Sequence, residues 1–348
     1  MLAFVAACQV IAGHPQFVVY TGLALVPLAI VRAATLGRAR RLWLVAGALA
    51  FAATLSAVTW LPALLYLPHT QRTDAAFVAR EARIWSLLPR DLLSLAWPRG
   101  VGYADAAYSG GMRATDYSNV SGLAAVVMAL AGLSWRVNGQ RVARLLAALA
   151  GLAMLLSLGR NLPVLGAFFQ ALPGFGTFRT PMTWLVLANL AITLLAARGL
   201  EWCLGPAAPA RMKVFAGVAL AGALIVGVMV GPLGEQWLEW ARHAQADRVA
   251  RNLVRDQAAL ARFVEAGPAA ATAAVGDLAL ELALAGAVLT LAAWPARARD
   301  ARVRGVAAAT AAVLVVAPLA ILSWPALRAA SGDPSALAPP PPPALAQA

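Results

Sequence analysis

The sequence is poor in charged side chains. Only 12% of its 348 residues are charged, 61% are hydrophobic, and the mean hydropathy is +0.73. Soluble domains carry about twice that share of charge, and a chain this apolar would aggregate in water unless lipid surrounded it. The shortage of charge therefore argues against an ordinary soluble protein. It predicts an all-α fold, a polytopic transmembrane helical bundle with outer interfacial helices.

Cysteine and nucleotide-binding motifs are also scarce. Cys8 and Cys203 are the only cysteines, and because they lie far apart in or beside apolar runs, they predict neither a disulfide framework nor a metal cluster. Phosphate-loop and dinucleotide glycine motifs are missing, so nothing indicates a nucleotide-driven reaction. The residues themselves predict no metal site and no cofactor. No basic residue precedes the first apolar run, MLAFVAACQVIAG, so we expect no signal peptide there.

Apolar runs near the length of a membrane helix, about 20 residues, occur eight times. The predicted spans are 15–32, 42–65, 119–135, 142–158, 180–198, 213–231, 276–295 and 304–324. Together they define a predicted transmembrane domain over residues 1–325, in which 1–12 is apolar but too short for a span. The proline-rich residues 326–348 cannot bury apolar area and are expected to form a disordered tail.

The formal net charge of +13 is first a signal of membrane topology and only distantly one of nucleic-acid binding. Half of the basic residues, 14 of 28, lie in or beside four short connections that hold only two acids, Glu201 and Asp300. These connections are 32–41, 136–144, 198–213 and 296–304. Short basic loops stay in the cytoplasm. The outer side then holds loops 66–118 and 232–275, connection 159–179 and the tail.

The second outer loop contains a predicted amphipathic helix over 235–265. One approximate apolar face is formed by Trp237, Trp240, Val249, Leu253, Leu260 and Val264. Three arginines, Arg248, Arg251 and Arg255, lie on another face. They are either a solvated face with Asp247 and Arg251 paired or a basic rail for anionic lipid headgroups.

Few polar groups occur at membrane depth, so each is a candidate for function. His14 precedes Pro15, which is suited to the first turn of a helix, and Gly13 permits a tight entry turn. His14 is then a capping or interfacial residue, or a proton carrier or substrate contact. Asp277 and Glu281 share a face. Asp277 is expected to compensate a helix N-terminus, and Glu281 is one turn deeper. Asn189 is expected to join helices.

Arg179 is the strongest single candidate. It stands in LPGFGTFRTP, directly before Thr180, a predicted helix cap, and Pro181, a predicted first helical residue. A guanidinium beside the free N–H groups of a helix start suits a phosphate group. The alternative is that Arg179 anchors the helix in the lipid headgroups.

Four stretches in this order resemble the YfhO family of bacterial membrane proteins. They are AGHPQFVVYTGLALVPLAI, LPALLYLPHTQRTDAAF, SLLPRDLLSLAWPRGVGYADAAYSGG and LGRNLPVLGAFFQALPGFGTFRTPMTWLVLANLAITLLAARGL. They cover roughly residues 1–200, and the last stretch is the most specific. The family is similar to GT-C glycosyltransferases, which take sugars from undecaprenyl-phosphate carriers outside the cytoplasmic membrane. The resemblance thus implies a multi-pass protein of the bacterial cytoplasmic membrane that acts on a lipid-linked sugar donor.

The resemblance also implies site residues. It places Arg72, His14 and Arg179 at the border of an outer substrate cavity, and the loop that contains Tyr108 in its wall. Pro98, Gly102 and Gly110 belong to the same loop. A divalent cation would fit the family, and membrane lipids are expected partners together with the donor.

The sequence departs from the family in two places. The acidic catalytic loop that normally follows an N-terminal span has no counterpart, and the usual outer C-terminal segment is replaced by the proline tail. We therefore expect a fragment, a truncated gene product or a divergent paralogue, and assign no catalytic residue. The alternatives are a lipid or small-molecule transporter, or a non-catalytic subunit that completes the membrane domain of a partner chain.

Overall fold

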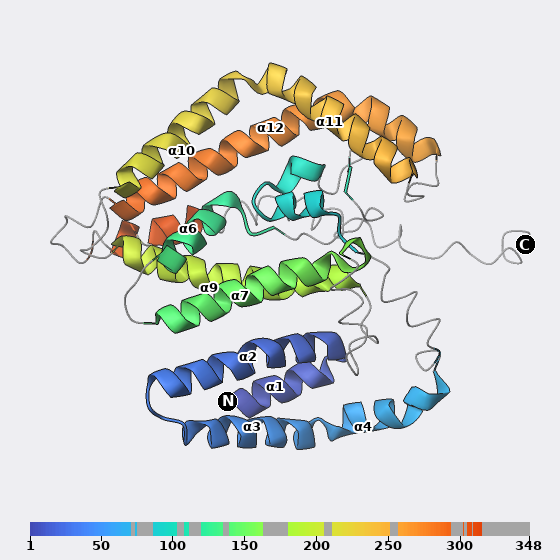
Figure 1. The fold of residues 1–348 in the computed structure, drawn as a ribbon, viewed down its shortest axis with the longest axis vertical. Coiled ribbons are helices and arrows are strands. Elements are labelled where there is room, and N and C mark those ends of the chain that lie inside the picture. The colour runs from blue at the N-terminus through green and yellow to red at the C-terminus, as the bar shows by residue number, and fades with distance from the viewer. Residues whose placement is uncertain are drawn as a thin grey trace, which may run out of the picture.

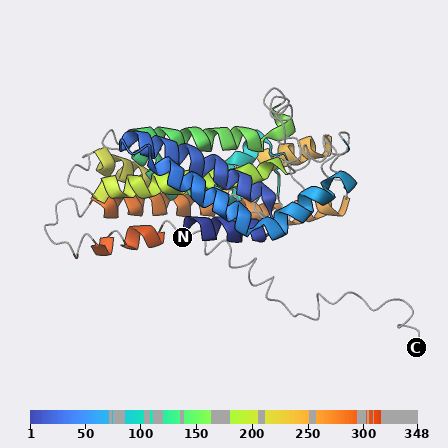
Figure 2. The ribbon, with the colours of Figure 1, turned by 90° about the horizontal axis from the view of Figure 1, so that it is seen from below.

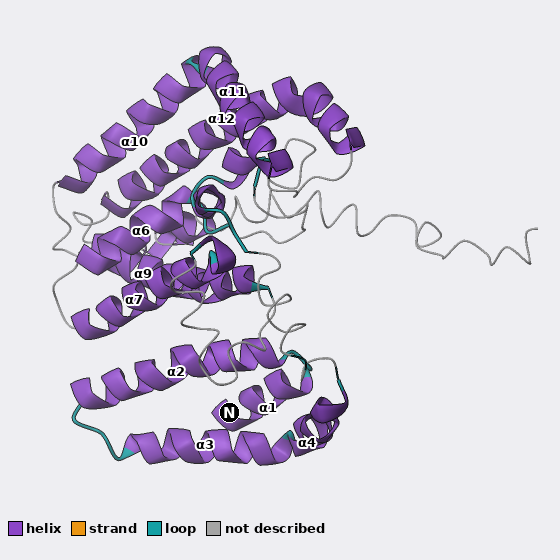
Figure 3. Ribbon diagram, turned by 45° about the vertical axis from the view of Figure 1, so that its right-hand side comes forward, coloured by secondary structure: helices purple, strands orange, loops and turns teal. Residues whose placement is uncertain are grey.

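Every element in the described part of the chain is helical (Figure 3). The computed structural model describes residues 1–70, 74, 86–102, 108–110, 120–134, 139–162, 180–204, 211–250, 257–293, 302, 305–307 and 309–314. The α-helices are α1 (Leu2–Ile11), α2 (Pro15–Thr35), α3 (Arg41–Leu55), α4 (Ala57–Tyr66), α6 (Leu123–Ser134), α7 (Gln140–Ser157), α9 (Leu185–Leu204), α10 (Arg211–Val228), α11 (Val230–Ala250) and α12 (Gln257–Ala293). Short 3₁₀ turns are η1 (Leu67–His69), η3 (Pro89–Leu95), η4 (Pro98–Val101), η5 (Gly159–Asn161) and η7 (Pro181–Trp184).

The helices form three groups that follow one another across the bundle (Figure 1). Helices α1 to α4 pack together, and α2 joins them to α7. The middle group is α6, α7 and α9, and the third group is α10, α11 and α12, with α12 packed against both α6 and α9. The largest buried cluster lies where α6, α7, α9 and α12 meet, and includes Met128, Leu195 and Val288. Seen from below, the blue α1–α4 group lies in front of the green and yellow helices (Figure 2).

The described helices identify an integral membrane protein that crosses the bilayer several times. Four helical segments are long and apolar enough to span a membrane, and up to six are if each bent helix pair counts as one span. Large apolar side chains project outward, with Trp43 and Val58 each 78% exposed and Leu224 70% exposed. Such a surface is stable in lipid and not in water. The described apolar helices at 123–133 and 305–314 are shorter than a full span.

One predicted span is a bent helix pair, and another ends where two helices meet at a sharp angle. Residues 42–65, predicted as one span, form α3 and α4, and the axis turns by 69° at Ser56. The Ser56 hydroxyl donates to the Ala52 carbonyl and the Trp60 indole N–H donates to Ala53, so carbonyl groups at the bend keep partners. Helices α10 and α11 meet at 82°. Pro232 lies in the first turn of α11, where the missing N–H of proline is tolerated. In the interior of a continuous helix, the same proline would remove a backbone hydrogen bond and break the helix.

The predicted single helix over 235–265 is wrong. Helix α11 ends at Ala250 and α12 begins at Gln257, and the two helices pack side by side (Figure 1). Helix α12 therefore starts well before the predicted boundary at 276 and runs through Pro268. Its early part is helical because Ala271 and Ala274 are buried against Trp237 of α11, a contact that the local sequence does not show.

The connections alternate between two ends of the bundle, named here by a residue in each. The Arg38 end holds the turn between α2 and α3 and the helix ends that flank the other three basic connections (left in Figure 1). The His14 end holds the turn between α1 and α2, the end of α7 and the start of η7. The two sets of connections that the sequence assigns to opposite sides of the membrane thus lie at opposite ends. Residues 326–348 lie outside the described chain.

Candidate functional site at the His14 end

The structure describes two of the four residues predicted to contact substrate. Arg72 and Arg179 lie outside the described residues. His14 is exposed and Tyr108 is half-buried, and both border the hydrophobic cluster formed around Tyr20 and Leu185, His14 through its ring contact with Phe17.

His14 occupies the turn that the sequence predicts. Gly13 has φ of 79° and Pro15 is the first residue of α2. The His14 ring lies 4.5 Å from the Phe17 ring, and its side chain makes no capping hydrogen bond to α2. The capping role is therefore wrong, and His14 is an exposed aromatic residue beside a helix start.

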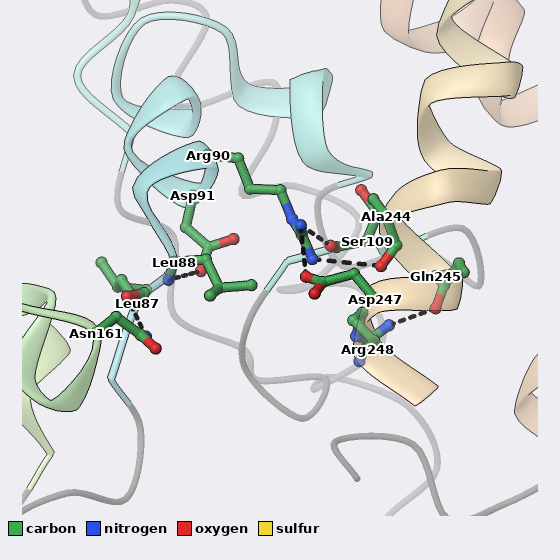
Figure 4. Close-up of polar contacts among 10 residues, drawn as sticks. All are labelled: Leu87, Leu88, Arg90, Asp91, Ser109, Asn161, Ala244, Gln245, Asp247 and Arg248. Carbon is green, nitrogen blue, oxygen red and sulfur yellow. Dashed lines mark hydrogen bonds and ion pairs between the residues drawn. The ribbon is translucent and has the colours of Figure 1, made fainter. Parts of the chain in front are cut away.

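The loop that contains Tyr108 is anchored on its early side by a buried carboxylate. Pro89 begins η3, and Asp91, only 3% exposed, accepts a hydrogen bond of 2.7 Å from the Leu88 N–H. Residues just before η3 are tied to the end of α7, because the Leu87 N–H donates to Ser157 and Asn161 donates to the Leu87 carbonyl. This anchoring positions Arg90 toward α11 (Figure 4).

Arg90 joins the loop to α11. Its guanidinium forms an ion pair of 2.9 Å with Asp247 and donates to the carbonyls of Ser109 and Ala244 at 3.0 and 3.3 Å. The side chains of Arg90 and Asp247 are 21% and 32% exposed, so we expect the pair to contribute about 1 kcal/mol or less to stability.

Arg248 holds the other side of the loop. It is 7% exposed, its guanidinium donates to the Tyr108 carbonyl, and its Cζ lies 5.1 Å from the centre of the Tyr108 ring. Gln245 donates to the same carbonyl at 2.6 Å. Burial lowers the pKa of the Arg248 guanidinium, and the negative charge of the nearby Asp91 carboxylate opposes this shift.

We call Arg90, Asp91, Tyr108, Asp247 and Arg248 the Arg90 cluster. Its two arginines are balanced by two aspartates, so it has no excess positive charge and acts as a clamp between the loop and α11. Gly110 is needed here, because a Cβ would overlap the Tyr108 hydroxyl and crowd Asp91 Oδ1 at 2.5 Å.

The clamp bears on two expectations for α11. Asp247 forms an ion pair with Arg90, and the predicted pairing of Asp247 with Arg251 stays untested, because Arg251 lies outside the described residues. Arg248 is buried against the loop and cannot belong to an exposed basic rail. The predicted single apolar face is not formed, because Trp237 and Val249 lie on α11 whereas Val264 lies on α12.

Two acids of α12 bind backbone N–H groups of other segments. Asp277 accepts from Arg99 at 3.1 Å, and Glu281, 1% exposed, accepts from Leu123 at 2.7 Å. Asp277 lies in the middle of α12, so its predicted role at the N-terminus of its own helix is wrong. Glu281 instead satisfies the first turn of α6, where a carboxylate is favoured by the helix dipole.

A buried polar triad that the sequence analysis missed joins α2 to η7. Gln16 donates to the hydroxyls of Tyr20 and Thr183 at 2.6 and 2.7 Å, and these two hydroxyls lie 2.7 Å apart. The spacing of Gln16 and Tyr20 is a signal that could have been used, because residues four apart share one helix face. Their partner Thr183 is 163 residues away from Tyr20, and no pattern in the sequence indicated it.

Thr180 has an unusual backbone beside Arg179. Its φ of 62° is the only positive value among the described residues other than glycine. Left-handed backbone at a β-branched residue costs about 1–3 kcal/mol. Its carbonyl accepts bonds from the Thr183 N–H and hydroxyl, and its side chain makes no capping bond. Thr180 therefore precedes the helical turn as predicted, but its side chain does not cap that turn. Pro181 begins the turn, as expected.

A cavity of about 330 Å³ lies between α6, α9 and the helix at 305–314. It is lined by Val120, Ser121, Ala125, Met128, Asn189, Thr193, Ala196, Ala197, Leu200 and Ala312. The Ser121 hydroxyl donates to Asn189 Oδ1 at 2.7 Å, so Asn189 ties α9 to the segment before α6, as the sequence predicts. The N–H groups of Ser121 and Gly122 both donate to Leu95 of η3. The cavity therefore begins directly under the anchored loop.

Comparison of the chain with protein-family models, with curated proteins and with solved structures found no match. The resemblance to the YfhO family thus rests on the four sequence stretches quoted above.

Proposed function

We propose that this chain binds a polyprenyl-phosphate-linked sugar at the outer face of the bacterial cytoplasmic membrane, as the lipid-binding part of a GT-C-like glycosyltransferase. One observation carries the proposal, namely the mainly apolar cavity along α9 whose polar end, at Ser121 and Asn189, adjoins the anchored loop. Such a ligand combines a long hydrocarbon chain with a polar headgroup, and the cavity and loop offer these two environments in that order.

The phosphate is assigned to the region of Arg179. The strained Thr180 follows it directly, and strained backbone is concentrated at functional sites. From Thr180 to Asn189 the helical segment η7–α9 extends about 15 Å, so a ligand with its phosphate at the start of η7 reaches the cavity with its chain. The Arg90 cluster is not assigned to the phosphate, because its arginines are balanced by carboxylates.

The cavity can be tested by filling it. Thr193 and Ala197 line it and are exposed on α9, so Thr193→Phe and Ala197→Phe add volume without disturbing buried packing. We expect each to weaken binding of undecaprenyl phosphate to the purified protein at least tenfold, measured by native mass spectrometry. The matched control is Leu194→Phe, a neighbour on α9 that is 42% exposed and does not line the cavity.

If both cavity variants bind undecaprenyl phosphate with unchanged affinity, the cavity does not hold the ligand and the proposal loses its main support.

The phosphate contact is tested separately with Arg179→Ala and Arg179→Lys. Loss of a contact to a buried anion costs about 2–5 kcal/mol, whereas a headgroup anchor contributes about 1 kcal/mol and tolerates lysine.

A lipid or small-molecule transporter is the second candidate, favoured by the two bent helix pairs at Ser56 and Met229. Broken membrane helices are common at transporter binding sites. Reconstituted vesicles distinguish the two, because a transporter moves a fluorescent lipid or solute across the bilayer without any sugar transfer.

A further inference from the structure

Three arginines and an exposed tryptophan surround a hollow at the opposite end of the bundle, where α2 turns into α3. The hollow has a volume of about 600 Å³ and is lined by Gly37, Arg38, Arg40, Arg41, Trp43 and Leu44. None of these residues belongs to the site at the His14 end, and the proposed function gives them no role.

The three guanidinium groups have no partner in the described part of the chain. No hydrogen bond or ion pair is formed there by the side chains of Arg38, Arg40 or Arg41, and all three are exposed. The sequence explains this, because residues 1–73 contain no aspartate or glutamate. The helices α1 to α4 therefore cannot neutralise these charges from within their own group.

The backbone holds the arginines in place. Gly37 has φ of 62°, and the Arg38 N–H donates to Ala33 at 2.9 Å, which closes the end of α2. The Arg41 N–H donates to Arg38 at 2.9 Å, so the next turn starts at once. Three cations are thus presented by a hydrogen-bonded turn of fixed shape.

Below the arginines the surface is apolar. Trp43 is 78% exposed and Leu44 is 73% exposed. Trp43 lies in the first turn of α3, three residues after Arg40, the residue that precedes the helix, and Leu44 lies three residues after Arg41 on one face of α3. A phosphate anion above and hydrocarbon below match this order, and tryptophan is the residue typical of the boundary between headgroups and acyl chains.

We propose that this hollow binds the headgroup of an anionic phospholipid, with its phosphate on Arg38, Arg40 and Arg41 and its acyl chains against Trp43 and Leu44. Guanidinium groups bind phosphate oxygens in pairs, and basic pockets at the ends of membrane helices favour anionic lipids. The site is independent of the sugar-lipid site, because it lies at the Arg38 end.

Trp43 makes the binding measurable. The purified full chain is reconstituted in phosphatidylcholine vesicles that contain either brominated phosphatidylglycerol or brominated phosphatidylcholine. Bromine quenches tryptophan fluorescence, and the fluorescence of Trp43 is obtained by subtracting the signal of the Trp43→Phe variant. We expect brominated phosphatidylglycerol to quench the fluorescence of Trp43 at a much lower mole fraction than brominated phosphatidylcholine does. Arg38→Gln with Arg41→Gln should reduce this preference about 25-fold, at roughly fivefold for each arginine.

The matched control removes two other exposed arginines from the same end, with Arg141→Gln and Arg144→Gln on α7. It should leave the Trp43 preference unchanged. In all variants Cys203, which is fully buried, should stay unreactive to thiol reagents, which shows that the fold is intact. Equal quenching by the two lipids, or a preference that survives in the Arg38 and Arg41 variant, overturns the proposal. Displacement of the lipid by inorganic phosphate alone also overturns it and assigns the hollow to free phosphate.

Discussion

Glu281 should determine how firmly α6 is held to α12. Its carboxyl group is 1% exposed and accepts the Leu123 N–H at 2.7 Å, with a second bond from the Ala124 N–H. Glu281→Ala leaves two buried N–H groups in the first turn of α6 without a partner. An unsatisfied buried donor costs about 1–3 kcal/mol, so we expect a loss of about 3 kcal/mol in the free energy of unfolding. Glu281→Gln keeps an acceptor oxygen and should lose about 1 kcal/mol.

Cys203 provides the assay. It is a free, fully buried thiol of α9 that lies in the same cluster as α6, whereas Cys8 is exposed. In a Cys8→Ala background, a thiol-reactive fluorophore added during heating in detergent therefore reports unfolding at the α6–α9 contact. Leu280→Ala is the control, because Leu280 is on the same turn but 45% exposed. If Glu281→Ala unfolds at the same temperature as Leu280→Ala, the carboxyl group does not hold α6.

Two further predictions concern packing and topology. Gly199→Ala should destabilise the bundle by about 1–3 kcal/mol or more, because a Cβ there would overlap the Met128 carbonyl, whereas Gly217→Ala, which has nothing within 4 Å, should be neutral in the same thiol assay. For topology, cysteines at Leu36 and His69 in a background free of Cys8 and Cys203 should differ in intact cells, with only His69→Cys labelled by an impermeant reagent. Labelling of Leu36→Cys alone would reverse the orientation inferred from the basic loops.

The class of protein and the polarity of its ends follow from composition and local pattern. Lipid solvates apolar helices, so runs of about 20 apolar residues need no tertiary partner to be recognised. The turn at Gly13 and Pro15 was predictable for the same reason, because left-handed backbone and a missing N–H are properties of single residues. Asn189 was predictable because an amide at membrane depth needs a partner.

Where helices bend, begin and end was harder to predict from the sequence. A bend at Ser56 depends on whether freed carbonyl groups find donors, and the donor from Trp60 is visible only once the chain is folded. Similarly, the alanine-rich start of α12 was assigned to an outer loop, because intrinsic helix propensity alone leaves a short helix marginally stable and the burial that stabilises this one comes from Trp237 on α11.

The candidate site also has features that the sequence predicted and features that only the structure revealed. The sequence by itself determined a helical membrane protein with basic connections at one end and polar candidates at the other, because hydropathy and charge act residue by residue. Only the tertiary structure decided which polar groups meet. Arg90 and Asp247 are 157 residues apart, and Leu123 and Glu281 are 158 apart. Such pairs arise because buried or half-buried polar groups must be satisfied by whatever the packed helices bring near, and the order of residues along the chain does not specify that neighbour.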